Sequence, residues 1–527
     1  MVSLLPSCSW VPHWTRRNLL VFPALLASVS GVRAQEGDSI PDADATPATL
    51  SLEYVLNATL AHSFPIERKN LRRRARQGEL QATAGMLDSR FTTSMSRARD
   101  VRAGVASSGL DGPALEQNTT AYRVTMERTL RSGITVAPQV QVSHLAVNAG
   151  TPYSTASVRL DFAVPLLRNR GGSLIRSSQT TVTRLLDADT HSYLHARSAA
   201  VLAALTAYWR YVASFARLEV QRASAKRALD LVRETEVLVG ADERPPADLN
   251  HVRGNLAVKR GAVLAAEQDV VVSRADLGLV MGIPREQVFQ LQHPAEALPR
   301  PAPVSTGEPP QSLVTLALQN RADLAAAGAL TRASAVVEEA ARQESRRGLD
   351  LFLSTGYTGI GQGHGYDPLY SSLVSNVRGL NMSIGLQWEA RFSNDHALGN
   401  VLTRSAQHEE ARIAEQDLAR QVEVHVEVGI EGVQRSSRSV MEVAEAVRLS
   451  RTTVENERIK HRLGSATLFD VILAEDNLTS ALLAEVAAQL KYAIALADLR
   501  YQTATLLQSD SVLSVERLNT LPPPAGG

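Results

Sequence analysis

The chain has 527 residues, of which 44% are hydrophobic and 21% are charged, and its formal net charge at pH 7 is +1. This near-neutral balance gives no indication of nucleic acid as a partner, because surfaces that bind nucleic acid are strongly basic. A single cysteine, Cys8, excludes a fold held by disulfides within the chain, so burial and assembly must provide its stability.

Residues 1–34 have the pattern of a secretory signal peptide. Arg16 and Arg17 precede a short apolar core from Leu19 to Val29, and Val32-Arg33-Ala34 resembles an A-x-A cleavage site. The paired arginines leave the twin-arginine export route open beside the general secretory route. Cleavage would remove Cys8 and three arginines, which leaves a mature chain without cysteine and with a formal net charge of −2. No apolar stretch of about 18 residues follows, so we expect no membrane-spanning helix, whereas insertion through β-strands remains open.

The mature chain contains an internal repeat. Ala58–Ile66 aligns without gaps with Leu316–Leu324 at an offset of 258 residues, and Asp248 aligns with Asp470 at an offset of 222. We therefore divide the mature chain into a first structural repeat (35–293), a proline-rich linker (294–310), a second structural repeat (311–509) and a C-terminal tail (510–527).

Each repeat is expected to contain a helix, strands and a long helical hairpin. In the first repeat, the patterns predict a helix at about 52–86, strands at 90–97 and 156–164, a helix at 174–239, a turn at 240–246 and a helix at 248–280. In the second repeat, they predict strands at 349–358 and 380–392 and helices on both sides of Gly464. A helix of roughly 65 residues is about 100 Å long. Val422 to Ile430 alternates as a strand does, but both neighbours are helical in pattern, so we keep this stretch helical. The fold class is mixed α and β, with long antiparallel coiled-coil hairpins.

The first repeat has an excess of 36 residues, because the offset falls from 258 to 222. The β-rich runs 121–130 and 134–145 flank Arg131-Ser132-Gly133, which predicts an extra hairpin at about 121–145.

The last long helix has a packing face. From Val471 to Tyr501, apolar or small residues recur at steps of three and four, and Glu475 is the exception.

Four stretches resemble the outer-membrane efflux protein family, of which TolC is the prototype. Leu50-Ser51-Leu52-Glu53 resembles the entry helix of that family, and Phe162 to Gly171 resembles its strand-to-helix junction. Ala207-Tyr208-Trp209 is similar to its long helix, and Leu463 to Val471 is similar to its hairpin tip. The resemblance covers nearly the whole mature chain.

The resemblance implies a homotrimer in the outer membrane of a Gram-negative bacterium. Each copy would give four transmembrane strands to a barrel shared by the trimer, and its helices to a periplasmic α-barrel. With four strands in the wall, the extra hairpin would lie outside it, so deleting Ala121 to His144 should leave the trimer intact. The trimer would be a passive exit duct for an inner-membrane pump and its periplasmic adaptor, in tripartite efflux or type I secretion, with no enzyme activity and no cofactor.

The resemblance also assigns site residues. Asp470 and Asp248 would form the pore constriction, Gly240 and Gly464 the tip turns that the adaptor contacts, and Pro165 and Gly171 the strand-to-helix junction. The first tip then carries two extra residues relative to the second. His461 and Ala466 replace the tyrosine and arginine that tie the closed tip in the family, so that lock is not reproduced.

Simpler interpretations stand beside these. Asp470 suits the first turn of any helix, and His191 and His195 could ligate a metal but have no evident third ligand. No HExxH, GxSxG or P-loop motif supports catalysis. The alternative function is a periplasmic coiled-coil scaffold or adaptor without a pore; a periplasmic hydrolase is the weakest hypothesis.

Overall fold

The computed structural model describes residues 49–106, 109–148, 150–301, 310–363, 367–374, 379–508 and 511–512. The predicted signal peptide lies outside these residues, as do residues 35–48 of the first repeat, residues 302–309 of the linker, and all of the tail except Ser511 and Val512.

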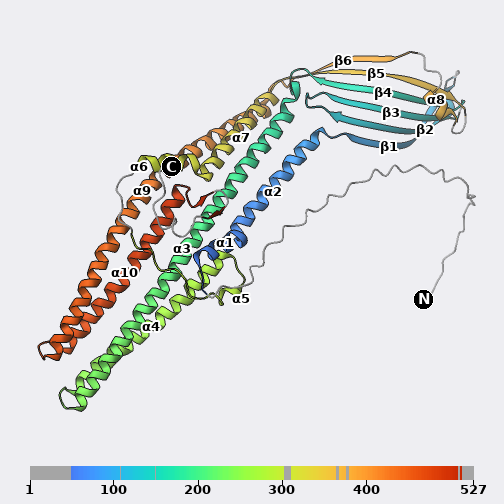
Figure 1. The fold of residues 1–527 in the computed structure, drawn as a ribbon. Coiled ribbons are helices and arrows are strands. Elements are labelled where there is room, and N and C mark those ends of the chain that lie inside the picture. The colour runs from blue at the N-terminus through green and yellow to red at the C-terminus, as the bar shows by residue number, and fades with distance from the viewer. Residues whose placement is uncertain are drawn as a thin grey trace, which may run out of the picture. The chain divides into compact units, whose positions relative to one another are not determined.

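Ten helices occupy the described residues (Figure 1). They are α1 (Leu52–His62), α2 (Phe64–Ala84), α3 (Ser173–Gly240), α4 (Pro246–Met281), α5 (Arg285–Val288), α6 (Pro310–Asn320), α7 (Ala322–Glu344), α8 (Asp367–Val374), α9 (Asp395–Arg462) and α10 (Leu468–Gln502). The single helix expected at 52–86 is in fact two helices, because Ser63 is extended (φ −65°, ψ 117°) and Pro65 has no N–H to continue the helical bonds. The stretch from Val422 to Ile430 lies within α9, and its buried members Val422 and Val426 are four residues apart.

The helices form two long hairpins, α3–α4 and α9–α10 (Figure 1). Helices α3 and α9 contain 68 residues each, about 100 Å. α2 packs along α3, α7 packs against α3 and α9, and α10 packs against α3 and α9. An ion pair between Arg76 Nε and Asp189 Oδ2 (3.0 Å) joins α2 to α3.

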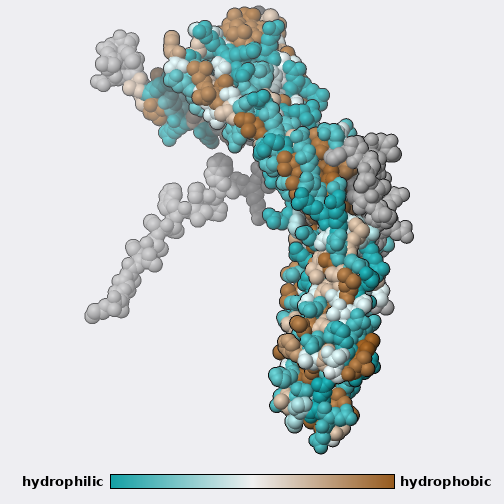
Figure 2. All heavy atoms as spheres, turned by 90° about the vertical axis from the view of Figure 1, so that its left-hand side faces the viewer, coloured by the Kyte–Doolittle hydropathy of each residue, from teal (hydrophilic) through white to brown (hydrophobic). Residues whose placement is uncertain are grey.

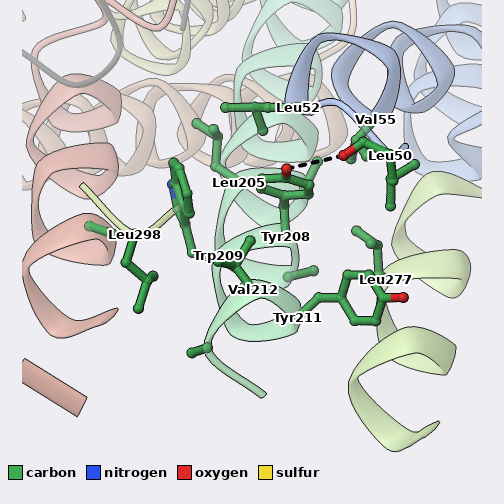
Figure 3. Close-up of a cluster of buried hydrophobic side chains, with 14 of the residues drawn as sticks. Leu50, Leu52, Val55, Leu205, Tyr208, Trp209, Tyr211, Val212, Leu277 and Leu298 are labelled. Carbon is green, nitrogen blue, oxygen red and sulfur yellow. Dashed lines mark hydrogen bonds between the residues drawn. The ribbon is translucent and has the colours of Figure 1, made fainter. Parts of the chain in front are cut away.

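The largest buried cluster surrounds Tyr208 and Trp209 of α3 (Figure 3). The Tyr208 hydroxyl donates to the carbonyl of Leu50 at 3.2 Å and contacts the carboxylate of Glu296. That carboxylate also accepts the N–H of Leu52 at 3.1 Å. The start of α1 and the first residues of the predicted linker are therefore fixed against the middle of α3.

Two helices, α3 and α10, are long and apolar enough to cross a membrane by length and composition alone, contrary to the expectation from sequence. In α3 most of the apolar window is buried among other helices. On the face shown in Figure 2, apolar side chains form separate patches among hydrophilic ones along the helices. The apolar stretch of α3 is thus part of the protein core.

Six strands form one antiparallel sheet in the order β1-β2-β3-β4-β5-β6 (Figure 1). They are β1 (Arg90–Ala106), β2 (Gly109–Thr129), β3 (Thr135–Val147), β4 (Tyr153–Pro165), β5 (Gly348–Gln362) and β6 (Asn381–Glu389). A separate pair, β7 (Leu507–Gln508) and β8 (Ser511–Val512), follows α10.

The two faces of the six-stranded sheet differ in polarity. Because paired residues share a face, the register places three largely apolar rows on one side. The rows are Met95, Tyr122, Val142, Ala156 and Gly359; Thr93, Val124, Val140, Val158 and Tyr357; and Arg128, Val136, Phe162, Leu353 and Ile384, in which Arg128 is the charged exception. The opposite face carries rows such as Thr92, Thr125, Gln139, Arg159, Gly356 and Asn381. The short helix α8 packs over the end of β3, β4 and β5 that lies away from the long helices.

The predicted extra hairpin is present, but the expectation that it lies outside a four-stranded wall is wrong for this sheet. Its strands, β2 and β3, pair with β1 on one side and β4 on the other. The turn between them also lies against the start of α3, since a Cβ added to Gly172 would come 2.1 Å from the carbonyl oxygen of Arg131. The sequence showed the hairpin but not which strands would flank it, because those pairings are not local.

This contact predicts that Gly172→Ala destabilises the protein more than Gly171→Ala. Both glycines have left-handed backbones (φ +71° and +66°), which cost an alanine about 1–2 kcal/mol. At Gly171 the nearest group to an added Cβ is the Arg176 guanidinium at 3.5 Å, whereas at Gly172 the β2–β3 turn would have to move. The midpoint of thermal unfolding should fall further for Gly172→Ala; equal shifts would contradict the packing of the turn.

Candidate functional site

The tip of the second hairpin turns at Gly464. Beyond the end of α9, the N–H of Ser465 donates to the carbonyl of Lys460 (2.9 Å), and the N–H of Gly464 donates to that of His461 (3.0 Å). Gly464 has φ +78°, so these two bonds form a Schellman motif with glycine at the left-handed position.

The tip of the first hairpin turns at Asp242 and not at Gly240, which corrects the predicted turn residue. Gly240 is the last residue of α3, while Asp242 has φ +61° and Glu243 N–H donates to the carbonyl of Leu238 (3.0 Å). Aspartate tolerates this conformation because its short polar side chain can form local hydrogen bonds. Asp242 therefore corresponds to Gly464, and the two tips have equal length, without the two extra residues that the glycine alignment implied.

A groove of about 720 Å³ lies between the two tips. Its lining includes both predicted constriction residues, Asp248 from the first turn of α4 and Asp470 from the first turn of α10. Arg244 and His251 of the first tip also line the groove, so the carboxylates lie beside groups that can carry positive charge. Gly464 also lines the groove, whereas Gly240 does not.

Asp470 belongs to a capping box at the start of α10. Its carboxylate accepts the N–H of Thr467 (2.8 Å) and the Thr467 hydroxyl (2.6 Å), and its own N–H donates back to that hydroxyl. The hydrogen bonds from the side chain and backbone of Thr467 lower the pKa of Asp470 below its ordinary value. The ordinary helix-start role of Asp470 is thus present, and it keeps the carboxylate ionised beside the groove.

Glu475 ties the two hairpins together one turn above Asp470. Its carboxylate accepts hydrogen bonds from Arg227 of α3 (2.6 Å) and Arg458 of α9 (2.6 Å), and Glu475 itself is only 9% exposed. The same side chain is the exception in the apolar face that the sequence shows. The sequence therefore marked Glu475 as unusual, because it is an acid within an otherwise apolar helical face. The sequence did not show that Arg227 and Arg458 would be its partners.

Further polar contacts reinforce this link. Lys259 of α4 forms an ion pair with Asp476 of α10 (2.6 Å), and the Thr479 hydroxyl donates to Ser224 of α3 (3.0 Å). Charged and polar groups thus contribute to the packing of α10 on the first hairpin, beside an apolar cluster at the tips that includes Val232, Val252 and Leu468.

His461 and Ala466 lie together within the second tip. The Nδ1 atom of His461 is 3.1 Å from the carbonyl oxygen of Ala466, and His461 is 9% exposed. This contact is within one tip, so it does not join the two hairpins.

The junction residues lie at the other end of α3. Pro165 ends β4 opposite Asp350 of β5, and the left-handed Gly171 precedes α3. Proline and left-handed glycine change the chain direction here from strand to helix.

No group of three metal-ligating side chains occurs among the residues described. His195 lies beside other partners: its Nδ1 is 3.9 Å from Asp323 Oδ2, and its Nε2 is 3.4 Å from the Tyr501 hydroxyl. This geometry places His195 in the packing between α3, α7 and α10.

The Glu475 link predicts a loss of stability in Glu475→Gln. The substitution leaves two guanidinium groups without a carboxylate in a mostly buried site, at a cost of about 1.5–3 kcal/mol. The midpoint of thermal unfolding should fall, whereas Glu442→Gln, at an exposed position of α9, should leave it unchanged. Equal midpoints for both variants would mean that the link does not hold the hairpins together.

Several solved structures have a similar fold. They include the outer membrane protein VceC of Vibrio cholerae (15% identity, 86% of this chain and 95% of that chain, TM-score 0.64), the outer-membrane channel OprN (15%, 88% and 94%, 0.66) and the outer membrane channel CmeC of Campylobacter jejuni (14%, 87% and 87%, 0.66). No protein-family model and no curated protein sequence matches the chain. These likenesses extend over nearly the whole of each chain and confirm the expected fold: this chain has the fold of the TolC-type outer membrane channels.

Proposed function

We propose that this chain is the protomer of a homotrimeric outer-membrane channel of a Gram-negative bacterium. The observation that carries the proposal is the two-faced sheet, which is apolar on one side from β1 to β6 and polar on the other. This alternation is what a strand needs when one face contacts lipid and the other contacts water.

The dimensions of the sheet suit a membrane. β6 has nine residues, and its apolar members Met382, Ile384, Leu386 and Trp388 are each at least 63% exposed. Nine residues extend about 30 Å at 3.3 Å per residue, close to the length that a transmembrane strand needs. A water-soluble scaffold or adaptor would have to cover these side chains, so the apolar face favours the channel.

Closure of the sheet requires more than one copy. Six strands are fewer than the eight of the smallest single-chain barrels, and lipid does not tolerate unpaired strand edges. A trimer, as the resemblance to the efflux proteins implies, supplies the missing strands. Its helical hairpins would then extend together into the periplasm.

The tips would form the gate of this duct. Three copies of Asp470 and Asp248 around one axis would give the constriction a negative potential, which favours cations. The turns near Gly240 and Gly464 would be the surface that a periplasmic adaptor contacts, and the adaptor would connect the duct to an inner-membrane pump for tripartite efflux or type I secretion. Glu475 and its arginines would hold the tips in one arrangement until the adaptor binds.

Fractionation followed by gel electrophoresis without heating tests the proposal. We expect the protein in the outer membrane, soluble only with detergent, and running as a trimer that heating converts to a monomer. A soluble periplasmic monomer would contradict the channel and favour the coiled-coil scaffold or adaptor.

The constriction predicts a change of selectivity in Asp470→Asn. Loss of three negative charges near the axis should lower the cation-to-anion permeability ratio several-fold in planar bilayers, and more so at low salt, where screening is weak. Glu442→Gln serves as a control for loss of a distant charge. An unchanged ratio in Asp470→Asn would remove Asp470 from the constriction.

The lowered pKa of Asp470 predicts how this selectivity responds to pH. A carboxylate with a lowered pKa keeps its charge as pH falls and loses it only below its ordinary range, about 3.9. The contribution of Asp470 should therefore persist from pH 7 to pH 5. Thr467→Val removes the hydroxyl donor and should move the loss of selectivity to higher pH; an unshifted profile in that variant would contradict the role of the capping box.

A further inference from the structure

The hairpin β2–β3 is an integral part of the sheet. β2 pairs with β1 from Gly109 to Glu127 and with β3 from Gln117 to Thr129, and β3 pairs with β4 over most of its length. Gly133 in its turn lies against Gly172 at the start of α3, where an added Cβ would come 2.9 Å from the Gly172 nitrogen. The hairpin is therefore held on both edges and at its turn.

The hairpin also continues the apolar face. Val124 and Tyr122 of β2 and Val140 and Val142 of β3 lie in the same rows as Val158 and Ala156 of β4. A hairpin outside the membrane would expose this surface to water at a cost proportional to its apolar area. The apolar rows thus require β2 and β3 to lie in the same lipid-facing wall as β4.

The free edges of the sheet are β1 and β6. Both are exposed along their length, and their apolar residues Phe91, Met95, Met382 and Ile384 are 67–77% exposed, more than the apolar residues of the inner strands. Because the sheet is antiparallel and its strand number is even, β1 and β6 run in opposite directions. β6 of one copy can therefore pair with β1 of the next and continue the antiparallel pattern, with the apolar faces aligned.

We propose that the partner of both edges is a second copy of this chain, and that three copies close a wall of eighteen strands, not the twelve that the resemblance implied. The inference rests on the proposed trimeric channel and changes the composition and width of its wall. At a strand spacing of about 4.8 Å and a tilt of about 40°, eighteen strands give a backbone diameter of about 36 Å, against about 24 Å for twelve. The polar face, with Arg123 and Arg159, lines this wider lumen.

Disulfide cross-linking in the full-length protein tests the pairing. Cys8 is the only native cysteine and lies in the predicted signal peptide. Any disulfide in the mature protein would therefore form between the introduced cysteines. Ser383→Cys in β6 is combined in turn with Thr92→Cys, Ser94→Cys, Ser96→Cys or Ala98→Cys in β1, which share the polar face. A disulfide forms only when the Cα atoms come within about 7 Å, so the best pair also gives the register. The matched scan combines Ser383→Cys with Gln139→Cys, Gln141→Cys or Ser143→Cys in β3.

We expect one β1 combination to shift the heated, non-reduced band from monomer to trimer, with reversal by reductant, while single variants stay monomeric. Because a twelve-stranded wall that leaves out residues 121–145 would have the same two edges, Ser94→Cys is also combined with Ser157→Cys in β4, which β2 and β3 separate from β1 in the eighteen-stranded wall. A disulfide between these two positions within one copy, or a trimer in the outer membrane that cross-links through β3, would overturn the eighteen-stranded wall and leave the channel intact. A trimer with no β1 cross-link would overturn it equally. A soluble monomer would remove the proposed function itself, and with it this inference.

Discussion

β1 and β6 are the edge strands of the sheet, and the backbone N–H and C=O groups along their outer sides need hydrogen-bond partners. The rest of the structure depends on how this requirement is met. In lipid, each unpaired backbone group costs several kcal/mol, so a sheet that enters a membrane must continue until it closes on itself. In the proposed channel, the six strands meet this condition by pairing with further copies of the chain. Since α3 and α9 follow β4 and β6 in the chain, the axis of the proposed wall would also gather the helical hairpins around it.

The helical part is stabilised in two different ways along its length. Near the middle of α3, Tyr208 and Trp209 lie in an apolar cluster that fixes the start of α1 through Glu296. Near the tips, polar and ionic contacts around Glu475 add to a smaller apolar cluster that includes Val232, Val252 and Leu468. Apolar packing is rigid and insensitive to salt, whereas ion pairs can be exchanged for other partners. In the proposed channel, this distribution would keep the body of the duct constant and allow a change at its tip.

The sequence predicted the long helices closely, because their periodicity is local and sustained. It failed where the outcome depends on distant partners or on the residue at which a helix ends. Runs 121–130 and 134–145 were correctly seen as a hairpin, yet their place between β1 and β4 depends on pairing across the sheet. Gly240 looked like the turn residue, but α3 continues through it and Asp242 takes the left-handed position. Glu475 was visible as an exception in an apolar face, without its arginine partners.

Single-channel recording of the wild-type protein in planar bilayers tests whether the assembled chain is a duct. We expect stepwise conductance from purified, detergent-extracted trimer, because the polar face of the sheet would enclose water across the membrane. Inserted trimer that gives no conductance steps, even after the tips are opened by breaking the Glu475 link, would contradict it.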